Sequence, residues 1–162
     1  MPNDARPLLL RLLMVTGLVM AVAGCSLVGA SASAILGSGP LVTVTTRGGE
    51  CMDGPCGSTV TIERDGTVHE AAKPPNELGT VSPELLTALD AAVKTADFTA
   101  IRAVAFTGEC PTAYDGQETI YEFGAPGGLE RVASCETAID PANPVFAATT
   151  AALVAVGVLA AP

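Results

Sequence analysis

The sequence has no tryptophan, and its 162 residues include only two tyrosines, four phenylalanines and one histidine. A core built from this chain must therefore rest on Val, Leu, Ile and Ala, with a few aromatic rings to help. Such a core is light, and covalent cross-links would stabilise it. The aromatic residues expected to join the core are Phe98, Phe106, Tyr121, Phe123 and Phe146.

Basic residues are scarce, with eight Lys and Arg against seventeen Asp and Glu. Without residues 1–24, six of the eight basic and sixteen of the seventeen acidic residues are left, a net charge of −10. No Lys/Arg cluster is present. An acidic surface repels phosphate backbones and anionic headgroups. We therefore expect no nucleic-acid binding and no membrane attachment through a basic patch.

Motifs of known chemistry are missing as well. The sequence has no Gly-x-Ser-x-Gly elbow and no phosphate-binding glycine loop, and its Asp-Gly pairs lack the ladder of a calcium loop. His69 is expected on a surface strand without a nucleophile beside it. Glu118 and Glu122 share one face of a strand, and two such carboxylates could catalyse glycoside hydrolysis. In so acidic a domain, however, the two side chains are better explained as part of a solvent-exposed surface. We therefore expect that the protein is not an enzyme and that it binds no cofactor and no metal.

The N-terminus carries a secretion signal. Arg6 and Arg11 precede an uncharged run from Leu12 to about Ala23, a pattern typical of signal peptides. Val22-Ala-Gly-Cys25 ends this run and resembles the lipobox of bacterial lipoproteins. The resemblance implies that Cys25 carries a diacylglyceryl group, that residues 1–24 are removed and that the new N-terminus is acylated, commonly with palmitate.

Two alternatives are a plain secretory peptide and a single transmembrane helix. Because the positive charge of Arg6 and Arg11 keeps the N-terminal end in the cytoplasm, each alternative also places the rest of the chain outside the cytoplasm. The expected organisation is a signal peptide (1–24), a Ser/Gly/Ala-rich flexible tether (25–40) and an extracytoplasmic domain (41–162). The expected location is the outer face of the cell membrane, held by the lipid on Cys25.

Four further cysteines belong to the exported domain, and an even count there favours two disulfides. Of the three possible pairings we favour Cys51–Cys56 and Cys110–Cys135, because each pair flanks or closes one expected hairpin. A zinc site with four thiolates is the alternative, but the second pair is too widely spaced for it.

The periodicity predicts strands followed by helices, twice. Ser82 and Asn143 are expected N-caps, each followed by a proline at the first helical position. The first helix, with an apolar stripe from Leu85 to Val93, is expected to end near Asp97. Strands are expected over 41–46, 58–64, 67–70, 118–123 and 129–135, with loops over 48–57, 71–80 and 106–116.

The expected fold is α+β, with two β-hairpins and two helices in a ββαββα-like order. The hairpins would form one antiparallel sheet, with the helices packed on one face. A weak internal repeat, Gly49-Glu-Cys51 against Gly108-Glu-Cys110, suggests a duplicated unit. The uncharged run from Phe146 to Pro162 is expected to pack on the sheet, with a membrane segment as the alternative.

The most unusual segment is the loop from Phe106 to Glu118. It carries Cys110, Pro111, Tyr114 and Asp115, and we expect these residues to form a partner-binding surface. The alternative is that Pro111 and Tyr114 only pack the loop onto the sheet.

Two resemblances concern the exported domain. The string Cys110-Pro-Thr-Ala-Tyr-Asp-Gly-Gln-Glu118 resembles one found in small exported proteins of actinobacterial type, over roughly residues 41–153, and implies no known activity. Thr46-Arg-Gly-Gly49 and the element order faintly resemble emfourin-like inhibitors of thermolysin-type metalloproteases. That second resemblance implies protease inhibition.

The sequence thus predicts a lipid-anchored, non-enzymatic module that binds a protein or peptide at the cell envelope. The alternatives are an inhibitor of a secreted metalloprotease and a small hydrolase that uses carboxylates.

Overall fold

The computed structural model describes residues 39–51, 54–72 and 74–160. All of them belong to one compact unit, Ala34–Pro162, which contains the whole sheet, its helices and both disulfides. The signal peptide, Cys25 and the tether as far as residue 38 lie outside the described residues, so those expectations stay predictions.

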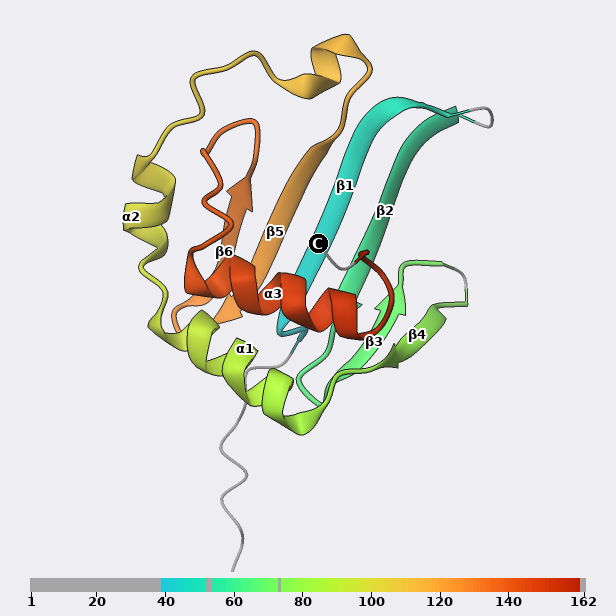
Figure 1. Ribbon diagram of the computed structural model, residues 1–162, viewed down its shortest axis with the longest axis vertical. Coiled ribbons are helices and arrows are strands. Elements are labelled where there is room, and N and C mark those ends of the chain that lie inside the picture. Colours follow the sequence, from blue (N-terminus) through green and yellow to red (C-terminus); the bar gives the residue numbers. More distant parts are fainter. Residues whose placement is uncertain (1–38, 52–53, 73, 161–162) are drawn as a thin grey trace, which may run out of the picture. The chain divides into compact units, whose positions relative to one another are not determined.

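A six-stranded antiparallel sheet forms the body of this unit (Figure 1). Its spatial order is β4-β3-β2-β1-β5-β6, so the first strand lies in the middle of the sheet. Each neighbouring pair is antiparallel. The strands are β1 (Val42–Cys51), β2 (Gly54–Ile62), β3 (Thr67–Glu70), β4 (Asn76–Thr80), β5 (Glu118–Ala125) and β6 (Gly128–Ala133).

The helices α1 (Pro83–Thr95) and α3 (Pro144–Ala155) pack together on one face of the sheet (Figure 1). Both begin as the sequence predicts: Ser82 Oγ accepts from Leu85 N, and Asn143 Oδ1 accepts from Val145 N. The α+β class, the antiparallel sheet with helices on one face and the two disulfides are confirmed. In the described residues, no helix is both long and apolar enough to cross a membrane.

The core lies between this sheet face and the two helices. Val42, Ile62 and Phe123 are fully buried because alternate strand residues point toward the helices. The rings of Phe123 and Phe98 lie 5.2 Å apart, and those of Tyr121 and Phe146 lie 5.0 Å apart. Of the five aromatic residues expected in the core, only Phe106 is not part of it.

The structure contains more elements than the sequence predicts. Residues 76–80 form an edge strand where a loop is expected, because their backbone pairs with β3 although Asn76-Glu-Leu-Gly-Thr80 lacks a strand pattern. Helix α1 ends at Thr95, with Ala96 as its C-cap, and Asp97 follows it. Asp97 caps a short helix, α2 (Phe98–Ala103), by accepting from Ala100 N at 2.9 Å.

The first hairpin is longer than predicted, since β1 and β2 run on through most of the expected 48–57 loop. The two Gly-Glu-Cys strings occupy different places. One ends β1, and the other lies in a loop before a 3₁₀ turn, η1 (Pro111–Tyr114). They therefore do not mark a duplicated unit.

The helices cover only part of their sheet face (Figure 1). The helices cross the sheet near the start of β1, and we call this end of the sheet the proximal end. The opposite end, with Cys51, η1 and the start of β5, is here called the distal end. Both disulfides lie at the distal end: Cys51–Cys56 pins the β1–β2 hairpin, and Cys110–Cys135 closes the base of the β5–β6 hairpin. The predicted pairing is confirmed.

The two disulfides should differ in their contribution to stability. Chain-entropy estimates give about 3.5 kcal/mol for Cys110–Cys135 and about 2 kcal/mol for Cys51–Cys56, because the first closes the longer loop. We expect Cys110→Ser with Cys135→Ser to lower the free energy of unfolding more than Cys51→Ser with Cys56→Ser. Urea denaturation of residues 34–162 measures both. A larger loss from the shorter loop would contradict this expectation.

Candidate functional site

The candidate site is the distal loop, residues 104–117, which connects α2 to β5. At its centre, Pro111 begins η1 and Asp115 ends it in a left-handed conformation, with φ 63°. Gly116 N donates to Pro111 O at 2.8 Å and closes the turn. A Cβ at Gly116 would lie 2.7 Å from Pro111 Cβ, so only glycine fits there. The string Pro111-Thr-Ala-Tyr-Asp-Gly116 therefore specifies one tight turn.

A glycine pair lets this turn approach the central strand. Gly48 and Gly49 both have positive φ, and β1 is irregular between Arg47 and Glu50. A Cβ at Gly48 would lie 2.6 Å from Thr112 Cγ2. Because both bulge residues are glycines, β1 has no side chain at the point where η1 contacts it.

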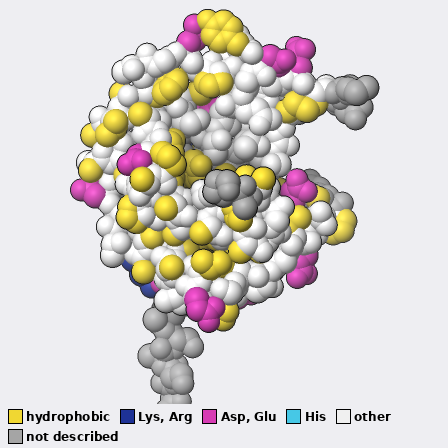
Figure 2. All heavy atoms as spheres, in the orientation of Figure 1, with side chains coloured by type: hydrophobic (Ala, Val, Ile, Leu, Met, Phe, Trp, Pro, Cys, Tyr) yellow, Lys and Arg dark blue, Asp and Glu magenta, His cyan; other side chains and the backbone are white. Residues whose placement is uncertain are grey.

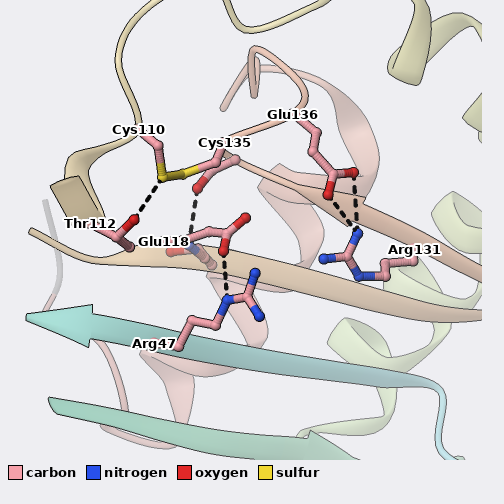
Figure 3. A network of polar contacts seen from close by, with 9 residues as sticks. Arg47, Cys110, Thr112, Glu118, Arg131, Cys135 and Glu136 are labelled. Atoms are coloured by element: carbon pink, nitrogen blue, oxygen red, sulfur yellow. Dashed lines mark hydrogen bonds and ion pairs between the residues drawn. A yellow bond between two sulfur atoms is a disulfide. The ribbon is translucent and has the colours of Figure 1, made fainter. Parts of the chain in front are cut away.

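The loop is also fixed from the other side, as Figure 3 shows. Cys110 is bonded to Cys135, which follows β6, and Thr112 Oγ1 lies 3.1 Å from Cys110 Sγ. Ser134 Oγ accepts from Thr119 N at 2.9 Å, so the segment before Cys135 is tied to the start of β5. The disulfide therefore holds the middle of the distal loop, and the Ser134 hydrogen bond holds the strand that follows the loop.

An ion pair with a buried carboxylate lies beneath the loop. Arg47 Nε donates to Glu118 Oε2 at 2.6 Å across the β1–β5 pair (Figure 3). The Glu118 side chain is only 4% exposed, whereas that of Arg47 is 60% exposed. A buried carboxylate is costly unless it is paired, so Arg47 holds a position that the fold requires. Glu118 and Glu122 do share a sheet face by register, but Glu118 is engaged by Arg47.

Tyr114 projects from this fixed loop into solvent and is 70% exposed. Its hydroxyl donates to a Glu109 carboxylate oxygen, and this bond raises the pKa of Tyr114 above its ordinary value. Asp115 and Pro111 are exposed beside it. The alternative in which Pro111 and Tyr114 pack the loop onto the sheet is therefore wrong for both side chains.

The charged side chains next to Tyr114 in the loop, Glu109 and Asp115, are acidic. Each basic side chain that the structure describes has a carboxylate within 4.0 Å; the pairs involve Arg47, Arg64, Lys94, Arg102 and Arg131. On the face shown in Figure 2, acidic side chains appear at both the distal and the proximal end, while Lys and Arg show only near the proximal end. A partner with positive charge would therefore meet complementary charge at Glu109 and Asp115.

His69 lies away from this loop, on β3. Its Nε2 is 2.9 Å from Glu63 Oε1, and its Nδ1 is buried without a hydrogen-bond partner in the described part of the chain. Thr61 is its cross-strand neighbour, yet no hydrogen bond joins the two side chains among the residues described. No cluster of three potential metal ligands occurs within these residues either.

Sequence reasoning found Cys110, Pro111, Tyr114 and Asp115 but gave no role to Arg47, Gly48 or Glu109. It considered Glu118 only as a carboxylate for hydrolysis and missed its ion pair with Arg47. The one available signal was Gly48-Gly49, since consecutive glycines inside a strand pattern indicate a bulge or a close approach of backbone. Comparison with models of protein families, with curated proteins and with solved structures found no match for this chain.

The Tyr114–Glu109 bond can be measured by titration. Because the bond stabilises the protonated phenol, it favours the folded state below the ordinary pKa of 10.0, and this contribution is lost as pH rises through the raised pKa. In Tyr121→Phe, Tyr114 is the only tyrosine. We expect ultraviolet titration of that variant to give a pKa above 10.0, and Glu109→Gln to lower it.

Asp115→Asn is the matched control, because it removes a neighbouring carboxylate that makes no hydrogen bond to Tyr114. An equal drop in the pKa of Tyr114 for both substitutions would show that general negative charge, and not the Glu109 bond, sets the value.

Proposed function

We propose that this chain is a lipid-anchored extracytoplasmic protein whose distal loop binds a protein or peptide at the cell envelope without catalysing a reaction. The observation that carries the proposal is the exposure of Tyr114 on a loop held in one conformation. Most large apolar side chains in the described residues are buried or half-buried. An exposed ring on a fixed support offers contact area at little cost in entropy.

The surroundings of Tyr114 indicate the chemistry of the partner. Glu109 and Asp115 flank the ring and make no ion pair with a described basic residue. A lysine or arginine on the partner could pair with these carboxylates and lie against the ring face. The proposed partner therefore presents a basic segment.

The proposal of an anchor rests on the sequence before the described domain. The charged start, the uncharged run and Val22-Ala-Gly-Cys25 support a lipid on Cys25. The domain has no unpaired basic side chain among its described residues that could hold it to anionic headgroups. Two or more acyl chains would make the attachment stable.

The binding proposal is tested by cross-linking in the native cells. A photoreactive amino acid replaces Ala113, an exposed residue beside Tyr114, and Leu129 is the control position because it is 66% exposed in the β5–β6 turn region. We expect one envelope protein to be captured from position 113 and not from position 129. Capture of the same proteins from both positions, or of none, would overturn the proposal.

The captured protein then permits a direct measurement of affinity. We expect Tyr114→Ala to raise the Kd at least tenfold, as for an interface residue that contributes about 1.4 kcal/mol or more. Leu129→Ala should leave the Kd within twofold. A captured metalloprotease that is slowed by the domain would identify the binding as inhibition.

The anchor is tested separately. Cys25→Ser removes the thiol that would receive the diacylglyceryl group, so we expect the variant to leave the detergent phase in a cloud-point partition. Intact mass of the native protein should show the lipid. Partition into detergent that survives the substitution would favour the transmembrane alternative.

A further inference from the structure

A second surface lies where the helices stop covering the sheet. Between α3 and the uncovered parts of β1, β2 and β5, the structure encloses a groove of about 190 Å³. Figure 2 shows this face hollowed between the distal end and α3. The floor is the sheet, and one wall is the segment after α3, where Gly157 reverses the chain and Val158 N donates to Leu153 O at 2.9 Å.

The lining of the groove is uncharged. Val44 and Val60 form part of its floor, and Leu153, Val158 and Leu159 form part of its wall. The remaining lining side chains carry hydroxyl groups, and no Asp, Glu, Lys or Arg lines it. Since the exported domain is strongly acidic overall, a neutral hollow is a local departure from the surface around it. A charged ligand would lose hydration there without gaining a partner.

Three of the hydroxyl groups that line the groove are free to bond a ligand. Thr46 and Ser58 already face one another at 3.3 Å, and Thr149 donates to Val145 O at 2.7 Å. The hydroxyls of Thr119, Tyr121 and Thr150 take part in none of the hydrogen bonds formed among the described residues, although all three residues line the groove.

Part of the floor of the groove is withdrawn from solvent at Tyr121, which is half-buried. Burial raises the pKa of Tyr121, and the Tyr121 ring packs edge-on against Phe146. At the mouth, Leu159 is 44% exposed, so apolar surface is left open to solvent. An apolar group that entered the groove would cover this surface and gain about 25 cal/mol per Å² removed from water.

We propose that this groove binds a small uncharged molecule, largely hydrocarbon, with one hydrogen-bonding group that meets the hydroxyl of Thr119, Tyr121 or Thr150. An apolar cavity of about 150 Å³ accepts benzene, so this groove has room for a chain of about six to eight carbons. The site is separate from the Tyr114 loop and does not depend on the function proposed for that loop.

The test uses 1-octanol as the probe and residues 34–162 as the protein, because this unit contains the complete sheet and its helices. We expect saturable shifts of the methyl resonances of Val44, Val60, Leu153 and Val158 in a carbon–proton NMR titration. Octanoate, which has the same chain and a negative charge, should bind at least tenfold more weakly. Equal binding of the two probes would overturn the proposal.

Two variants localise the binding. Ser58→Asp places a carboxylate at the groove, on an exposed position of β2, and should weaken octanol binding at least tenfold. Thr59→Asp places the same charge on the opposite face of the same strand and should leave the affinity within twofold. Equal effects of the two variants, or shifts that do not saturate, would show that octanol partitions onto the surface without a site.

Discussion

The rest of the structure depends on one limitation: the helices cover only part of the sheet face on which they pack. Helices α1 and α3 have 13 and 12 residues, and they bury the proximal part of β1, β2 and β5. A chain with so few aromatic residues has little further apolar area with which to cover the distal part. The distal strands are therefore held by other means. Two covalent bonds, the ion pair of the buried Glu118 with Arg47 and a glycine bulge do there what a hydrophobic core does at the other end.

Both proposed surfaces follow from this incomplete cover. The distal loop can present Tyr114 because it is braced by Cys110–Cys135 and by contact with Gly48, and needs no helix above it. The groove exists because α3 ends at Ala155 and its following residues turn back instead of extending over β1. Rigid support at the loop and an open hollow beside α3 are thus two results of the same shortage of core-forming residues.

The parts of the fold that sequence could predict are those set by local chemistry. Ser82-Pro83 and Asn143-Pro144 fix helix starts through their own side chains and rings, and Leu89 and Val93 fix the buried side of α1 by spacing. The disulfide pairing could be predicted because the alternation of apolar and polar residues indicated the hairpins that each pair of cysteines flanks or closes. The edge strand β4 escaped prediction because pairing with β3, and not the pattern of Asn76–Thr80, makes it a strand. The same holds at the site, where Arg47 meets Glu118 through the register of strands that are far apart in sequence.

The position of β1 has a mechanical consequence. The chain enters the domain at the proximal end and passes directly into β1, the strand that is bonded on both sides by β2 and β5. A load applied between the start of β1 and the distal end would act along the strands. Such a load shears the hydrogen bonds of both ladders together, whereas a load across the strands would open them one after another. With the proposed anchor at the N-terminus and the proposed partner at the distal end, the domain would resist extension between the two.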